Sequence, residues 1–437
     1  MARPALSVCM IVRDEERMLP ACLESIAGVF AQLVVVDTGS TDNTVGIAES
    51  FGAEVHHFEW VDDFAAARNE SIRYATEPWI LWLDADERLP ESAQATLLEL
   101  LVPPKKPTIY QVLIRNLQAD GKSFTLSMSH RLITRHAELQ FSGRIHEQVF
   151  PSLGAAGGVE KPSRLVLEHQ GYALDGASLR AKLERNRPLL EALVAEQPAS
   201  GYAHYTLGQN HALLGNHEAA LLAYQQALEI KDFAGPSLAT LLNAVAEANW
   251  QLGRLDEAER HAQRSLALAP HQSSGNFIMY RVMRSRGNVG GQIQWLEALL
   301  PRTDKEEGTA GSDLPKDVLI PRQHVLYSLG ELHLSQENPA AAEKALQECL
   351  SFEPECQETR SLLATAEARV YRWDPLLATL EGVAHPHPEE LRELRGIALI
   401  KLRRFDEAIA HYRTWLEAEP EHPGLRKRLA GLYAKGG

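Results

Sequence analysis

The chain has 437 residues, of which 45% are hydrophobic and 23% charged, and its formal net charge is −14 at pH 7. This length allows two or three domains with sizeable cores, and the composition is that of an ordinary globular protein. The acidic balance argues against a nucleic-acid binder or an anionic-membrane binder, because either would need a basic surface.

Three absences in the sequence indicate the compartment. The four cysteines have no metal-ligand spacing, which favours a reduced compartment. The N-terminus lacks a basic region followed by a cleavable apolar segment, and no apolar run approaches the ~20 residues of a membrane helix. We therefore expect a cytoplasmic protein with no membrane span.

The first part of the chain alternates short apolar runs with helical patterns. Strands that alternate with helices imply right-handed crossovers and a mostly parallel sheet. A hairpin about the Asp120-Gly121 turn and one more strand are expected to complete this half. The expected strands cover residues 6–12, 33–36, 54–58, the apolar part of 79–87, 108–117, 124–134 and 165–168.

The segment Trp79–Glu87, WILWLDADE, combines a buried strand with a cluster of acids at its carboxyl end. Ligands of open α/β sheets bind at that edge. Asp84 and Asp86 would repel each other without a cation, so the pattern suggests a divalent metal that carries a phosphate. The alternative is that one of them caps the helix that begins near Pro90. Acids that follow the earlier strands at the same edge favour the metal.

Four ordered blocks, LSVCMIVRDEE, VVVDTGSTDNT, FAAARNES and WILWLDADE, resemble the GT-A fold of the family-2 glycosyltransferases over residues 5–175. The chain is similar to the bacterial subset in which a short transferase domain precedes tetratricopeptide repeats. Some members of that subset modify lipopolysaccharide core sugars, and others are peptide S- or O-glycosyltransferases. The resemblance implies a Rossmann-like α/β GT-A domain with a mostly parallel sheet over residues 1–175.

The resemblance also assigns the donor site. Asp37 would contact the uracil or ribose, Asp84 would hold the ribose or the metal, and Asp86 would ligate Mn²⁺ or Mg²⁺ on the diphosphate. The residues at the end of the first strand that would lie under the nucleotide base are Val12, Asp14 and Glu15.

Arg68 is a candidate on its own chemistry, because an arginine is a fixed, always charged fork suited to phosphates or to an acidic rim. The alternative is an ordinary helix salt bridge to Asp62 or Asp63. The sequence leaves both open.

The segment 141–149, FSGRIHEQV, alternates as a strand would and places Glu147 on the same face as its apolar neighbours. A partly buried glutamate suits a general base, and GT-A enzymes commonly carry an acidic base at this point, so Glu147 is the predicted base. His146 would orient the substrate or be a satisfied strand histidine. His169, after the last strand, matches the histidine that closes the metal shell in many GT-A domains, and imidazole suits Mn²⁺ better than Mg²⁺. An incidental loop histidine is the alternative for His169.

From Gly201 the sequence repeats with a period of about 34 residues, which indicates an all-α tetratricopeptide-repeat solenoid over 201–437. A linking helix is expected over 176–200, an insertion near 301–321, and a polar cap at the C-terminal end. About six units are expected, starting near Gly201, Ala239, Ser273, Gln323, Gln357 and Glu389.

The predicted activity is metal-dependent, inverting transfer of a sugar from a nucleotide sugar, most simply a UDP-sugar. The acceptor would be a peptide, protein or glycan held by the repeats, unless the repeats form a homodimer. A nucleotidyltransferase would need a basic, Gly-rich loop after the first strand, where this chain has Arg13-Asp14-Glu15-Glu16. The other rival is a repeat scaffold or adaptor with a catalytically inactive transferase-like domain.

Overall fold

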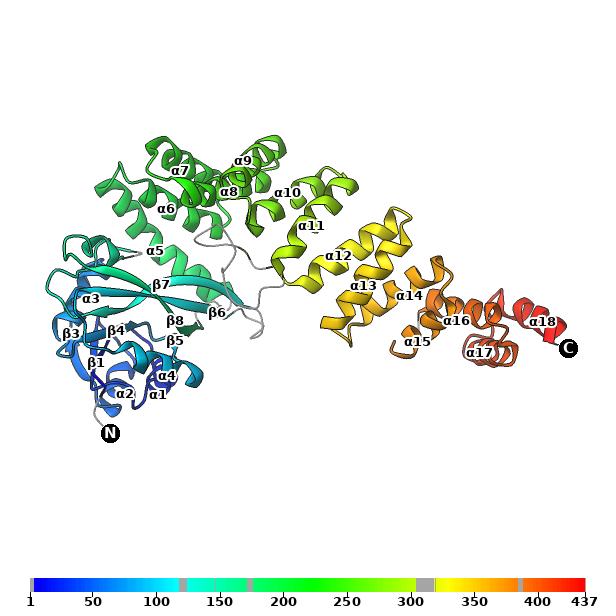
Figure 1. Ribbon diagram of the computed structural model, residues 1–437, viewed down its shortest axis with the longest axis horizontal. Helices are drawn as coiled ribbons and strands as arrows, with labels where there is room; N and C mark the ends of the chain where they lie inside the picture. Colours follow the sequence, from blue (N-terminus) through cyan, green and yellow to red (C-terminus); the bar gives the residue numbers. More distant parts are fainter. Residues whose placement is uncertain are drawn as a thin grey trace. The chain divides into compact units, whose positions relative to one another are not determined.

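The computed structural model describes residues 4–117, 124–145, 147–170, 176–303, 318, 320–383 and 388–436. In this part of the chain the N-terminal half forms one mixed sheet with the strand order β3-β2-β1-β4-β7-β6-β8-β5 (Figure 1). The strands are β1 Leu6–Val12, β2 Gln32–Asp37, β3 Glu54–His57, β4 Trp79–Leu83, β5 Glu87–Arg88, β6 Thr108–Leu117, β7 Phe124–Thr134 and β8 Val159–His169.

Strands β3, β2, β1 and β4 pair in parallel, as the alternation of strands and helices predicts. β2 and β4 are buried along their whole length, which accounts for their continuous apolar sequences. One face of the sheet packs against α1, α2 and α4, and the other face packs against α3. The helices are α1 Leu19–Ser25, α2 Thr44–Ser50, α3 Phe64–Arg73 and α4 Glu91–Leu100.

The second part of the sheet is a hairpin with one further long strand. β6 and β7 pair antiparallel, β7 pairs antiparallel with β4, and β8 lies parallel to β6. The bounds of β6 and β7 confirm the predicted hairpin, although its Asp120-Gly121 turn lies outside the described residues. β8 begins before the predicted strand and reaches His169, so this histidine ends a strand and does not lie in a following loop.

The described residues of the segment 141–149, which are 141–145 and 147–149, form no strand, so the prediction from its alternation is wrong. Its described residues form one isolated antiparallel bridge, between Ser142 and Gln148. Ile145 and Val149 are buried because the segment packs between α3 and later helices, which produces the same apolar alternation without strand pairing.

All the described structure after β8 is helical. α5 is Gly176–Glu196, where a linking helix was expected, and α6–α17 follow as pairs with α18 last. The bounds are α6 Gly201–Leu213, α7 His217–Ile230, α8 Gly235–Gln251, α9 Leu255–Leu268, α10 Ser273–Ser285, α11 Val289–Thr303, α12 Arg322–Ser335, α13 Pro339–Phe352, α14 Gln357–Arg369, α15 Trp373–Glu381, α16 Glu389–Lys401, α17 Phe405–Ala418 and α18 Leu425–Gly436.

Glycines let the two helices of a pair approach closely. A Cβ on Gly208 of α6 would lie 2.5 Å from the ring of Tyr224 in α7, and a Cβ on Gly330 of α12 would lie 2.5 Å from Leu346 in α13. This is the physical reason for the small residue that recurs in the repeat pattern. The all-α solenoid is confirmed, whereas the predicted domain boundaries stay predictions.

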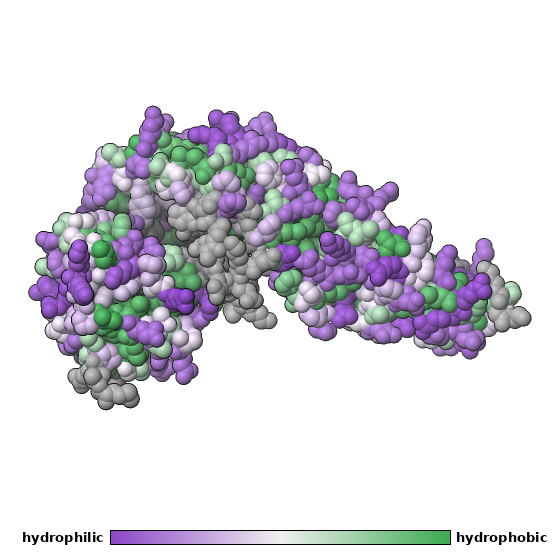
Figure 2. Space-filling view, in the orientation of Figure 1, coloured by the Kyte–Doolittle hydropathy of each residue, from purple (hydrophilic) through white to green (hydrophobic). Residues whose placement is uncertain are grey.

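The chain divides into two compact units, Met1–Ile278 with Glu307–Leu319, and Met279–Glu306 with Ile320–Gly437. On the face drawn in Figure 2, α12–α18 of the second unit present mostly hydrophilic residues with small apolar patches between them. Within the described residues, no helix is both long and apolar enough to cross a membrane.

Candidate functional site

The carboxyl ends of β1, β2 and β4 meet at one edge of the sheet, because these strands are parallel and in register. Val12 at the end of β1 pairs with Asp37 at the end of β2. Asp84 directly follows β4, which lies on the other side of β1. The acids that the sequence places after three separate strands are therefore neighbours in space.

Two turns form the β1–β2 side of this edge. Asp14 has a positive φ of 55°, and its Oδ1 accepts from the amide of Thr41 at 2.7 Å. Asp37 is buried and accepts from the amide of Ser40 at 3.1 Å and from Nδ1 of His57 at 3.4 Å. Both acids thus brace the loops of this edge, and His57, at the end of β3, is a neighbour that sequence reasoning missed.

Helix α3 supplies the central cation. The buried Arg68 donates from Nη2 to Oδ1 of Asp84 at 2.6 Å and from Nε to Oε1 of Glu147. Burial opposes its charge, but the two carboxylates outweigh burial and raise the pKa of Arg68 above its usual range. Arg68 therefore lies among the acids at the sheet edge, and the alternative ion pair of Arg68 with Asp62 or Asp63 is not formed.

Asp84 is held from two sides. Nη2 of Arg131, in β7, donates to Oδ2 of Asp84 at 3.2 Å and also to the buried Glu87. Burial would raise the pKa of Asp84, but Arg68 and Arg131 outweigh it and hold that pKa well below its usual range. The alternative role as a helix cap is wrong for both Asp84 and Asp86, because α4 begins at Glu91, its N-cap residue is Pro90, and no side chain caps it.

Trp82 joins the two arginines. The guanidinium carbon of Arg68 lies 4.1 Å from the centre of its indole ring, and that of Arg131 lies 3.5 Å from it. The indole Nε1 donates to the carbonyl of His130 at 2.7 Å, which fixes the ring. Cation–π contacts of this kind stabilise the arginines in a place where they have lost most of their hydration.

Sequence reasoning missed Arg131, and it gave no role to Glu87. One signal was available. The segment WILWLDADE ends in three acids, and the third, Glu87, implies a cation partner in addition to a metal ion. The identity of that partner depends on the pairing of β7 with β4, which the sequence alone does not state.

Asp86 and His169 face each other at the end of β4. The β5–β8 pairing sets Glu87 opposite His169, so Nε2 of His169 lies 3.2 Å from Oδ2 of Asp86. On the other side, Nδ1 of His169 lies 2.9 Å from Oδ1 of Asn116, which is its register partner in β6. Asn116 also donates from Nδ2 to Oγ of Ser127 at 3.1 Å, which orients its amide oxygen toward the histidine.

Glu15 lies half-buried near these acids. Burial first, and then the charges of Asp86 and Asp84, raise the pKa of Glu15 to about 7. Two cations of α5, Lys182 and Arg185, act in the opposite direction and lower it.

The segment that carries Glu147 is fastened to α3. Asn69 and Phe141 exchange two hydrogen bonds of 2.9 and 2.8 Å, and the amide of Phe64 donates to the carbonyl of Arg144 at 2.8 Å. The same helix therefore positions both Arg68 and the predicted base. His146 lies outside the described residues.

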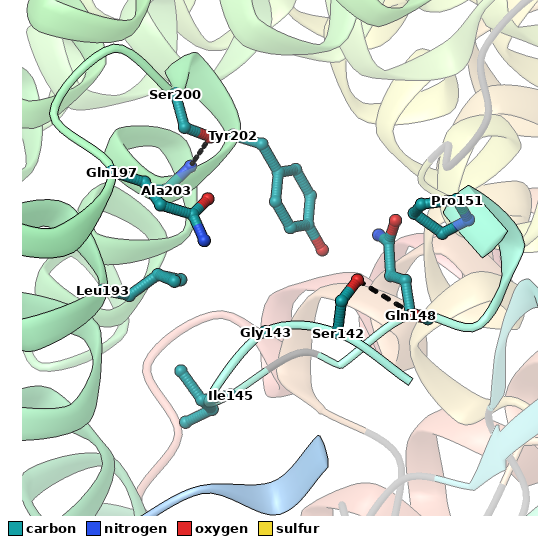
Figure 3. A pocket seen from close by; sticks show the side chains of 10 residues that line it. All are labelled: Ser142, Gly143, Ile145, Gln148, Pro151, Leu193, Gln197, Ser200, Tyr202 and Ala203. Carbon is teal, nitrogen blue, oxygen red and sulfur yellow. Dashed lines mark hydrogen bonds between the residues drawn. The ribbon is translucent and has the colours of Figure 1, made fainter. Parts of the chain in front are cut away.

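A small cavity adjoins this segment (Figure 3). Its volume is about 160 Å³, and it lies between the segment and the ends of α5 and α6. In the described part of the chain, no three His, Cys, Asp or Glu side chains are arranged to hold one metal ion together.

The sheet edge and the helix pairs define a glycosyltransferase with a C-terminal repeat array. The family model "Glycosyl transferase family 2" matches residues 7–156, and tetratricopeptide-repeat models match residues 182–237, 323–356 and 392–437. The chain therefore has an N-terminal domain of glycosyltransferase family 2, as its sequence motifs predict, followed by tetratricopeptide repeats.

Three relatives show how far this similarity extends. A TPR repeat-containing protein of Synechococcus elongatus is 35% identical over 66% of this chain and 73% of its own length. The SPbeta prophage-derived glycosyltransferase SunS of Bacillus subtilis is 25% identical over 50% of this chain and 52% of its own. The lipopolysaccharide core biosynthesis glycosyltransferase LpsC of Rhizobium meliloti is 30% identical over 33% of this chain and 57% of its own. The chain thus spans little more than half the length of the two relatives that are named glycosyltransferases.

Proposed function

We propose that this protein is a metal-dependent, inverting glycosyltransferase that uses a UDP-sugar and modifies a peptide, protein or glycan acceptor presented by its repeats. The observation that carries the proposal is the alignment of Asn116, His169 and Asp86. When Nδ1–H of His169 donates to Asn116, a neutral imidazole directs the lone pair of Nε2 at the Asp86 carboxylate. Two acceptors that face each other across 3.2 Å require a proton or a cation between them.

The charges around this pair also favour a cation. Arg68 and Arg131 pair with acids of this cluster of five carboxylates, and Lys182 and Arg185 of α5 add two cations near Glu15. An excess of up to one negative charge remains when all of the acids are ionised. The pKa of Glu15 is raised first by burial and then by the charges of Asp86 and Asp84. The groups are Arg68 and Arg131 against Glu15, Asp84, Asp86, Glu87 and Glu147.

A carboxylate and an imidazole fit Mn²⁺ well and Mg²⁺ less well. Asp86 and His169 would hold the ion. Asp84 would not be a direct ligand, because its carboxylate is paired with Arg68 and Arg131. When bound, the ion would neutralise the charge that builds on the diphosphate leaving group.

The nucleoside would bind beside this pair, along the ends of β1 and β2. We assign Val12, Asp14 and Glu15 to the base and Asp37 to the uracil or ribose. The support is their common position at the sheet edge, together with the hydrogen bonds that hold the turns of Asp14 and Asp37 rigid.

Glu147 would act as the base. Its carboxylate removes the proton of the acceptor hydroxyl or thiol while the acceptor atom forms a bond to the anomeric carbon. The bond from that carbon to the diphosphate oxygen breaks, and UDP leaves with the electron pair. Arg68 fixes the orientation of Glu147, and an attack from the face opposite the leaving group inverts the sugar.

The test is turnover of a panel of radiolabelled UDP-sugars with Mn²⁺ and with EDTA. We expect one sugar to be released or transferred only when Mn²⁺ is present, and Asp86→Asn to lose this turnover. The matched control is Glu91→Gln, an exposed acid in the first turn of α4, which should behave as wild type. Equal turnover in EDTA, or in Asp86→Asn, would refute the metal site. No turnover of any UDP-sugar by folded protein would refute the donor.

A further inference from the structure

The cavity in Figure 3 is lined by residues that flank Glu147 in the chain. Ile145 and Gln148, its near neighbours in the chain, both line the cavity. A Cβ on Gly143, also in the lining, would lie 3.7 Å from Cα of Glu147. A group bound in this cavity therefore lies beside the backbone of Glu147, whose side chain is paired with Arg68.

The opposite wall belongs to the helices that lead into the repeats. Tyr202, in the first turn of α6, points across the cavity toward Gln148, and Gln197, just after α5, points into it (Figure 3). Partial burial, opposed by Gln148 and assisted by the charge of Glu147, raises the pKa of Tyr202. The first repeat helix thus reaches the neighbourhood of the proposed base.

The two walls are fixed to each other. Arg144 forms an ion pair of 2.7 Å with Glu196 at the end of α5. Ile145, from one wall, also packs in one apolar cluster with Leu190 and Leu193 of α5. A cavity with such walls is formed before a ligand arrives, which lowers the entropy cost of binding.

Among the residues that the structure describes, the lining has no charged side chain. Its polar groups are two carboxamides and three hydroxyls, and its remaining surface is largely apolar. One hydroxyl, that of Ser200, accepts from the amide of Ala203 and caps α6. The lining residues are Ser142, Gly143, Ile145, Gln148, Pro151, Leu193, Gln197, Ser200, Tyr202 and Ala203.

We propose that this cavity is the acceptor subsite and that it takes one uncharged residue of an extended polypeptide. This assignment rests on the proposed function, because it needs Glu147 to be the base. A carboxamide carries both donors and an acceptor, so Gln148 and Gln197 match the alternating N–H and C=O groups of an extended chain. The volume of about 160 Å³ is well below the ~300–1,000 Å³ of sites that enclose a whole small ligand, so it suits one residue of a larger acceptor. The described lining residues offer no cation to a phosphorylated or carboxylated glycan.

The test uses the full-length protein, radiolabelled UDP-sugars with Mn²⁺, and two acceptor probes. One probe is a mixture of synthetic peptides of randomised uncharged residues with Ser, Thr or Cys at the centre, and the other is a set of neutral methyl glycosides. The variants are Tyr202→Ala and Gln197→Ala, with Tyr371→Ala as the control. Tyr371 is an exposed tyrosine just before α15 in the second unit.

We expect label in the peptides, a KM for peptide raised about tenfold or more in Tyr202→Ala and Gln197→Ala, and wild-type values in Tyr371→Ala. UDP binding by both cavity variants would show that they are folded. Label only in the glycosides, label in neither probe while the donor is hydrolysed, or an unchanged KM in both variants would overturn the peptide subsite. A wild-type protein that neither hydrolyses nor transfers any UDP-sugar would instead overturn the proposed function.

Discussion

Replacement of Arg68 by methionine tests the charge network most severely. The Arg68 side chain is 6% exposed, and that of Glu147, which it binds, is 10% exposed. Asp84 keeps Arg131 when Arg68 is lost, but Glu147 is left as a buried carboxylate without this cation. Removing one partner of a buried ion pair costs about 3–5 kcal/mol, because the other charge is left uncompensated.

This cost should be measurable in the sheet itself. We expect the amides of β1 and β4 in Arg68→Met to exchange with deuterium roughly two to four orders of magnitude faster than in wild type, which is what about 3–5 kcal/mol produces. Exchange read on these peptides by mass spectrometry excludes the contribution of the repeats. Arg68→Met combined with Glu147→Gln should recover part of the lost stability, because the unpaired charge of Glu147 is then removed.

Arg73→Met is the matched control. Arg73 lies on the same helix, and its side chain is 63% exposed in an ion pair with Glu70. An exposed pair contributes about 0–1 kcal/mol, so exchange should barely change. If Arg68→Met exchanges no faster than Arg73→Met, the network does not stabilise the sheet and our reasoning on Arg68 fails.

Three more predictions concern catalysis, charge burial and repeat packing. Glu147→Gln should lower kcat about 10²–10⁴-fold in transfer assays and keep UDP binding, because only proton removal is lost; an unchanged kcat would exclude it as the base. Burial raises the pKa of Glu367 from 4.5 to about 7, so the folded state binds more protons than the unfolded state within this window, and stability falls as pH rises through it. In urea unfolding, Glu367→Gln should therefore stabilise the protein by on the order of 1–2 kcal/mol near pH 8 and have little effect near pH 4, whereas an equal effect at both would contradict the shift. Gly208→Ala should destabilise by about 1–3 kcal/mol through its clash with Tyr224, whereas Gly431→Ala in α18, whose added Cβ meets nothing within 4 Å, should not lower the thermal unfolding temperature.

Periodicity was enough to predict most of the fold. The apolar strands and the hairpin strands 108–117 and 124–134 are observed where the pattern sets them, because burial on one or both faces determines which residues a strand uses. The alternation in 141–149 misled for a physical reason. Apolar side chains that pack a loop against helices can have the same spacing as those of a half-buried strand. The loop differs from a strand because it has no strand to pair with.

The candidate site could be predicted only in part. Its acids stand at strand ends and are visible in the sequence, and Arg68 was identified because an arginine there matches their charge. Arg131 and Asn116 could not be found, because they reach the site through the register of β7 with β4 and of β6 with β8. Register between strands distant in the chain is set by the packed sheet as a whole.

The most direct test of the proposed site is calorimetric titration with UDP in the presence of Mn²⁺ and then of EDTA. We expect wild type to bind UDP only with the metal, Asp86→Ala and His169→Ala to lose affinity by about tenfold or more, and His136→Ala, which alters an exposed histidine after β7, to bind as wild type. UDP binding that survives EDTA, or that is equal in Asp86→Ala and wild type, would contradict a metal held by Asp86 and His169.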